Sequence, residues 1–109
     1  GEWEGRFWQD LCNESPDFLE RWATVASRAP RGESLHDVFD RIKPALSRIH
    51  SEHSPGSNIL IVIHGGSGKV MRGTLLGLQP EEFPHLPTIG NASLTLFSRQ
   101  DDVWLEAAP

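Results

Sequence analysis

The stretch ILIVIHGGSG at residues 59–68 decides the fold predicted for this chain. Its first five residues are apolar without polar alternation, which is typical of a strand covered on both faces in a parallel sheet. The glycines after His64 indicate a tight turn, and we expect a helix from about residue 67 to residue 76, ended by Gly77. A strand, a turn and a helix in this order predict an α/β fold.

The helices expected before this stretch are marked by their caps and by apolar spacing. Ser34 and Asp37 form a capping-box pattern, after which apolar residues recur on one helical face. Pro44 lies inside that pattern and predicts a bend, because it removes one backbone hydrogen bond. Two shorter helices are expected over residues 6–14 and 16–27.

Strands are few for a parallel sheet. Besides residues 59–63, only residues 92–97 and 103–105 have strand character, on either side of a turn. An open sheet usually has about five strands, and a buried strand needs hydrogen-bonded neighbours on both edges. We therefore expect that some strands of the sheet are missing from this chain.

The composition excludes several function classes. The 109 residues amount to one domain, and ten basic against fifteen acidic residues give a net charge of −5, which argues against nucleic-acid and membrane partners. The longest apolar run is too short to span a bilayer. Cys12 is the single cysteine, so no internal disulfide forms and the cytoplasm is the expected location. The first residue is not methionine, so we expect the chain to begin inside a longer one.

His64 is the candidate functional residue. Ligands of open α/β sheets bind beyond the carboxyl ends of the strands, where His64 lies. Gly65 and Gly66 let backbone N–H groups approach a ligand, and the following helix directs its positive end to the same place. These features predict a site for an anion such as phosphate; the structural alternative is a histidine that only begins a helix. Lys69 and Arg72 are interpreted mainly as a solvated face of that helix.

Two known glycine-containing motifs, the P-loop and the nucleophile elbow, do not fit the residues around His64. A P-loop would need glycine at Ile63 and a hydroxyl side chain at Val70. A nucleophile elbow centred on Ser67 would need its closing glycine where Lys69 stands, which weakens that alternative without removing it. No Cys/His cluster indicates a metal site.

Four blocks together resemble the histidine phosphatase superfamily, in the branch of cofactor-dependent phosphoglycerate mutases and small phosphatases. They are GEWEG at residues 1–5, GESL at 32–35 with Asp37, Val38 and Arg41, IVIHGG at 61–66, and NAS at 91–93. The resemblance implies a three-layer phosphoglycerate mutase-like α/β sheet with helices on both faces. Residues 1–109 would be the C-terminal part of this single domain, without its N-terminal strands.

The resemblance also implies a mechanism. Family members form a phosphohistidine on an Arg-His-Gly motif that this sequence lacks. His64 matches their second catalytic histidine, and Gly65 and Gly66 match the backbone that contacts phosphoryl oxygens. The expected activity of the full-length parent is phosphate-ester hydrolysis or phosphoryl transfer, without metal or organic cofactor, whereas the chain alone is expected to be inactive.

Two alternatives to this activity remain: a non-catalytic fragment or paralogue that acts as a binding or assembly module, and, more distantly, a serine esterase that uses Ser67. The expected partners are a small phosphorylated substrate or inorganic phosphate. We also expect either a homo-oligomer or pairing with the missing N-terminal half, because unpaired strand edges favour association.

Overall fold

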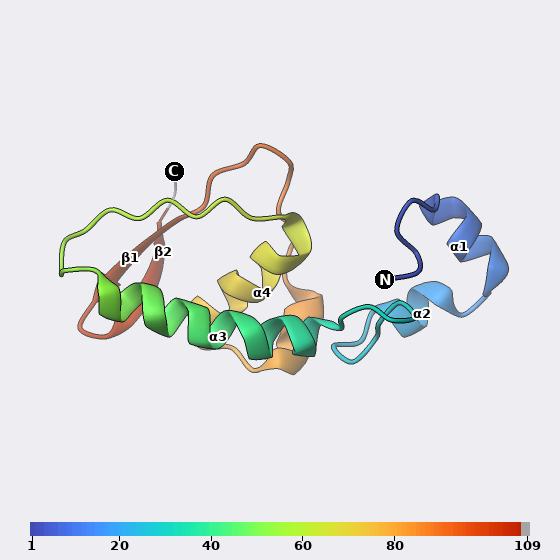
Figure 1. Ribbon diagram of the computed structural model, residues 1–109, viewed down its shortest axis with the longest axis horizontal. Helices are drawn as coiled ribbons and strands as arrows, with labels where there is room; N and C mark the ends of the chain where they lie inside the picture. The colour runs from blue at the N-terminus through green and yellow to red at the C-terminus, as the bar shows by residue number, and fades with distance from the viewer. Residues whose placement is uncertain (108–109) are drawn as a thin grey trace.

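The computed structural model describes residues 1–107, which form an elongated molecule with extents of 50 × 26 × 23 Å. Figure 1 shows two short helices at one end, a β-hairpin at the other, and a long helix beneath a second one between them. The elements are α1 (Trp8–Glu14), α2 (Phe18–Trp22), α3 (Leu35–Glu52), α4 (Gly65–Leu75), the 3₁₀ helix η1 (Pro80–His85), β1 (Leu96–Gln100) and β2 (Val103–Ala107).

Helix α3 begins at the predicted capping box. The Ser34 hydroxyl accepts the N–H of Asp37 at 3.1 Å, and the Asp37 carboxylate accepts the N–H of Ser34 at 2.8 Å. The helix continues through Pro44 to Glu52, so the proline does not end it. The bend expected at Pro44 stays a prediction.

The hydrophobic core lies where α3, α4 and η1 meet. Its buried members are Val38 and Ile42 of α3, Val70 of α4 and Phe83 of η1. Val70 and Phe83 are completely buried. Gly73 permits this packing, because a Cβ atom there would lie only 2.5 Å from the Cε1 atom of the Phe83 ring. This core fixes the direction of α4 relative to α3.

The N-terminal end has its own aromatic cluster, formed by Trp3, Trp8, Phe18 and Trp22 with ring centroids 5.0–6.1 Å apart. The helix predicted over residues 16–27 is wrong in length, since α2 ends at Trp22. One turn suffices to place Phe18 and Trp22 in the cluster. The Val25 carbonyl instead accepts the N–H of His36 at 3.1 Å, which ties this segment to the start of α3.

The prediction of a strand over residues 59–63 is wrong for the described residues. The segment is not hydrogen-bonded into any sheet of the described residues, and all five side chains are exposed, Val62 by 90%. Figure 1 shows it as a long connection between α3 and α4. No segment in residues 1–107 pairs with its edges, since the sheet of the described residues contains β1 and β2 alone.

The C-terminal hairpin is the sheet that the described residues contain. β1 and β2 are antiparallel, and Asp101 and Asp102 make the turn with φ of 46° and 65°, as in the tight turns that suit a hairpin. β1 begins at Leu96, later than the predicted residue 92, and Ala92 itself has a φ of 53° that a strand does not allow. The described residues are therefore an α/β assembly with one two-stranded sheet.

Candidate functional site

His64 lies immediately before α4, as its N-cap. Its backbone is extended, with φ −81° and ψ 156°, and its side chain makes no capping hydrogen bond. The side chain is exposed. The His64 carbonyl accepts the N–H of Gly68 at 2.7 Å, which closes the first turn of the helix. The imidazole is therefore available to a ligand at this end of α4.

Helix α4 begins at Gly65, two residues earlier than the sequence predicts. Gly65, Gly66 and Ser67 are consequently its first residues, and N–H groups at such positions have no acceptor within the helix. The helix dipole adds partial positive charge at the same end. The amide donors expected around Gly65 and Gly66 thus lie directly after His64.

The glycines of this turn differ in their surroundings. A Cβ atom at Gly66 would meet nothing within 4 Å, so space is open beside its backbone. A Cβ atom at Gly68 would lie 3.0 Å from Ile89 and 3.4 Å from Ile63, so Gly68 serves packing. Among the glycines of this turn, Gly66 has the most open space beside its backbone.

A hollow of about 480 Å³ opens next to this turn. That volume lies within the range of small-molecule pockets, roughly 300–1,000 Å³. Its lining comes from the end of α2, the start of α3, the first turns of α4 and the region around η1, and includes Trp22, Glu33, Arg41, Gly65, Gly66 and Lys69. His64 is not among the lining residues. The hollow therefore contacts the glycine turn, while the His64 side chain lies outside its walls.

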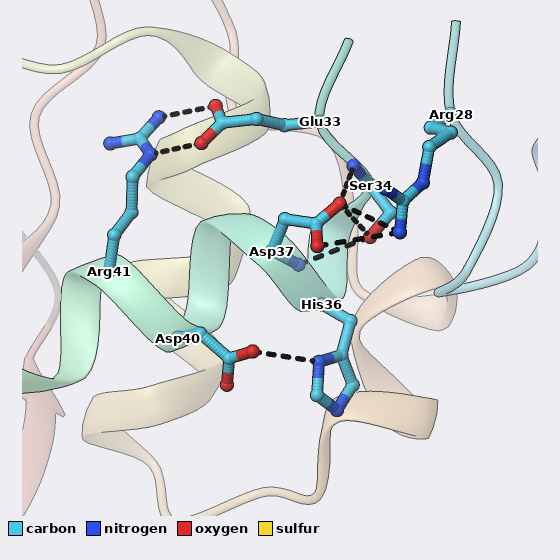
Figure 2. Close-up of polar contacts among 7 residues, drawn as sticks. All are labelled: Arg28, Glu33, Ser34, His36, Asp37, Asp40 and Arg41. Atoms are coloured by element: carbon cyan, nitrogen blue, oxygen red, sulfur yellow. Dashed lines mark hydrogen bonds and ion pairs between the residues drawn. The ribbon is translucent and has the colours of Figure 1, made fainter. Parts of the chain in front are cut away.

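On the α3 side of the hollow, Arg41 and Glu33 form a bidentate ion pair. Arg41 Nε and one terminal nitrogen donate to the two Glu33 oxygens at 2.7 and 3.0 Å, as Figure 2 shows. The hydrogen bonds from Arg41 lower the pKa of Glu33, and the Glu33 carboxylate raises the pKa of Arg41. The two charges therefore cancel at this wall.

Ser34, which also lines the hollow, is 2% exposed and belongs to a second polar group. Its backbone N–H and then its hydroxyl lower the pKa of Asp37, whose carboxylate also lies 3.1 Å from Arg28 (Figure 2). Figure 2 also shows His36 Nδ1 near Asp40, at 3.3 Å. Ser34 and Asp37 hold the loop at Glu33 against α3.

Lys69 and Arg72 do not form the solvated helix face that the sequence indicates. Arg72 is tied to Glu106 at 2.9 Å, which links α4 to β2. Lys69 is half-buried and lines the hollow, with its Nζ atom 3.4 Å from the Pro84 carbonyl. Lys69 therefore lines the same hollow as Gly65 and Gly66, whereas Arg72 has a structural contact with β2.

Other lining residues were missed by sequence reasoning. Trp22 at the end of α2 and the loop residues Thr24 and Thr88 line the hollow from distant parts of the chain, so no motif could have indicated them. Ser67 also lines it, from the first turn of α4. Within residues 1–107, no group of three or more His, Cys, Asp or Glu side chains could hold a metal ion. The same residues contain no helix long and apolar enough to cross a membrane.

Known proteins are similar to this chain in sequence. The model of the histidine phosphatase superfamily (branch 1) matches residues 1–107. A glucosyl-3-phosphoglycerate phosphatase of Mycolicibacterium vanbaalenii is 32% identical over 100 residues, 85% of this chain and 44% of that protein. A 2,3-bisphosphoglycerate-dependent phosphoglycerate mutase of Gloeothece citriformis is 38% identical over 61 residues, 55% of this chain and 26% of that protein.

The fold is shared with solved structures. A mycobacterial glucosyl-3-phosphoglycerate phosphatase with inorganic phosphate is similar at a TM-score of 0.83 and 27% identity, over 99% of this chain and 57% of that chain. The same phosphatase with VO3 gives a TM-score of 0.83 and 28% identity, with the same coverage. The chain thus spans about half the length of the relatives that it matches.

Proposed function

Because the chain belongs to the histidine phosphatase superfamily, we propose that it carries half of a site for phosphate-ester hydrolysis, with His64 as the second catalytic histidine. The observation that carries this proposal is the turn at α4, where an exposed imidazole is followed by glycines at a helix N-terminus. In this proposal Gly65 and Gly66 bind phosphoryl oxygens through their N–H groups. Two solved relatives, with inorganic phosphate and with VO3, support a ligand of this kind.

His64 acts by stabilising charge. A phosphoryl group in transfer carries negative charge on its oxygens, and fixed donors aimed at those oxygens lower the barrier. His64 donates a hydrogen bond from its ring while the helix N–H groups hold the remaining oxygens. The 109 residues contain no Arg-His-Gly motif, so the histidine that becomes phosphorylated is not one of them, and the chain alone is inactive.

We also propose where residues 1–109 lie in the complete domain. Residues 1–109 would form the C-terminal part of one phosphoglycerate mutase-like domain. In the complete domain, residues 59–63, which are unpaired in the described structure, would join its three-layer sheet as a strand. The exposed apolar side chains of that segment support this, since such a run is normally buried on both faces. Its edges pair with strands of the remaining half of the domain or with a second copy of the chain. The proposed location is the cytoplasm.

A test of the proposal uses the full-length parent, in which residues 1–109 would be joined to the N-terminal half that carries the Arg-His-Gly motif. His64→Ala should lower kcat for phosphate-ester hydrolysis about a hundredfold or more, as loss of other electrostatic donors does. His53→Ala is the matched control, because His53 is an exposed histidine at the opposite end of the 53–64 connection and should leave kcat unchanged. Near-normal turnover of the His64 variant would refute the role.

A second candidate function is a non-catalytic binding or assembly module. The exposed residues 59–63 and the missing Arg-His-Gly motif favour it. Hydrolysis of p-nitrophenyl phosphate by the full-length parent supports the catalytic proposal, and its absence supports the module. Hydrolysis by the 109 residues alone would contradict both. Labelling of Ser67 by a fluorophosphonate would instead favour the serine esterase.

A further inference from the structure

Trp22 is the one aromatic side chain, among those that the structure describes, that lines the hollow at the α4 turn. It lies at the end of α2, and 42% of it is exposed. Part of this exposed surface faces the hollow, since Trp22 belongs to its lining. The hollow therefore joins the backbone of Gly65 and Gly66 to the surface of an indole ring.

The other rings of the aromatic cluster hold Trp22 in one orientation. The Phe18 ring lies almost parallel to it, at an interplanar angle of 8° and 6.1 Å between ring centres. Trp3 and Trp8 pack against it at 5.6 and 5.7 Å. Phe18, at the centre of these contacts, is buried. A ring that is already fixed loses little conformational entropy when a ligand binds to it.

The lining near Trp22 provides apolar surface for the organic part of a ligand. Its apolar side chains are those of Ala23, Leu35, Val38 and Pro84. Small-molecule sites are mostly apolar, with a few polar groups that fix the orientation of the ligand. In this hollow the backbone donors of the α4 turn are suited to that orienting role.

Several polar side chains of the lining already have partners within the chain. Glu33 and Arg41 bind each other through both carboxylate oxygens (Figure 2). The Ser34 hydroxyl donates to Asp37 at 2.8 Å, and the Thr24 hydroxyl donates to the Arg21 carbonyl at 3.2 Å. The hydroxyls of a sugar would compete with these bonds, whereas an aromatic ring needs no hydrogen-bond partner.

We propose that Trp22 stacks against an aromatic ring of the substrate, so that the site accepts aryl phosphate esters. This inference rests on the proposed function, in which Gly65 and Gly66 hold the phosphoryl group. The ring of the ester lies against Trp22 in another part of the same hollow, whose volume of about 480 Å³ suits a small molecule. Trp22 thus determines specificity and takes no part in the chemistry.

The test measures binding to the 109-residue chain, labelled with ¹⁵N, from the amide signals of Gly65 and Gly66 and the indole signal of Trp22. The probes are methylphosphonate, phenylphosphonate and glucose 1-phosphate. We expect phenylphosphonate to bind about tenfold more tightly than methylphosphonate, which corresponds to about 1.4 kcal/mol and is within the contribution of an aromatic pair. Glucose 1-phosphate should bind no more tightly than methylphosphonate.

Two variants assign the preference to one ring. Trp22→Leu should abolish the preference for phenylphosphonate and leave the Kd of methylphosphonate unchanged. Trp8→Leu is the matched control, because Trp8 belongs to the same cluster and is 47% exposed but does not line the hollow. It should keep the preference. Nuclear Overhauser effects between phenylphosphonate and the Trp22 ring of the unsubstituted chain test the contact without any substitution.

Four results would overturn the inference: a preference that survives in Trp22→Leu, one that is lost equally in Trp8→Leu, an equal gain for glucose 1-phosphate, or no Overhauser effect between the phenyl ring and Trp22. The proposed function has a separate criterion. If methylphosphonate leaves the Gly65 and Gly66 signals of the unsubstituted chain unmoved, the proposed function itself fails, and the inference with it.

Discussion

Gly73→Ala tests the packing that directs α4 toward the site. The added methyl group would lie 2.5 Å from the Cε1 atom of Phe83 and 3.2 Å from Leu86 Cδ1. Carbon atoms in contact are about 3.5–4.0 Å apart, so one partner must move by about 1 Å. Phe83 is completely buried and also lies 5.6 Å from the Phe39 ring, measured between ring centres. The ring therefore has little room to move.

Two opposing effects determine how much Gly73→Ala changes the free energy of unfolding. Overpacking a filled core costs about 1–3 kcal/mol, and an overlap of this size belongs to the upper part of that range. Alanine is better than glycine in a helix by about 1 kcal/mol. We therefore expect Gly73→Ala to lower the free energy of unfolding by about 1–2 kcal/mol.

Gly66→Ala is the matched control, since it lies in the same helix and its Cβ atom would meet nothing within 4 Å. The helix-propensity gain is similar in both variants, so the difference between them isolates the steric cost, about 2–3 kcal/mol. Urea unfolding followed by circular dichroism gives both free energies. If Gly73→Ala is as stable as Gly66→Ala, the packing argument is wrong.

Two further predictions concern other parts of the chain. The N–H and hydroxyl of Ser34 hold the pKa of Asp37 below its ordinary value, so the ionised carboxylate stabilises the fold above the unfolded-state pKa, and this contribution is lost as pH falls through the folded-state pKa. Asp37→Asn should flatten the loss of stability as the pH falls below about 4, the ordinary pKa of an aspartate, measured as urea midpoints; a slope equal to that of the original chain would contradict it. Leu60 and Val62 are 79% and 90% exposed, so lysine at both positions should reduce self-association in sedimentation velocity and leave the free energy of unfolding within about 0.5 kcal/mol. A large drop in stability would show that the segment is packed.

Local signals predicted several elements because their causes lie within a few residues. The capping box needs only Ser34 and Asp37, and the start of α3 is where the sequence places it. Gly77 has a φ of 71°, which glycine adopts readily, and it follows the end of α4 as predicted. The hairpin was predicted from a turn between two apolar runs, although its first strand begins later than predicted, at Leu96.

Pairing and packing were decided only by the tertiary structure. Residues 59–63 have the composition of a buried strand, but a strand also needs neighbours for its N–H and C=O groups, and no described segment supplies them. The hollow at the α4 turn is built from segments far apart in the chain, so neither its walls nor the position of Lys69 can be read from spacing. The sequence by itself therefore determined the turn at His64, a local backbone property, while three-dimensional packing decided which side chains meet there.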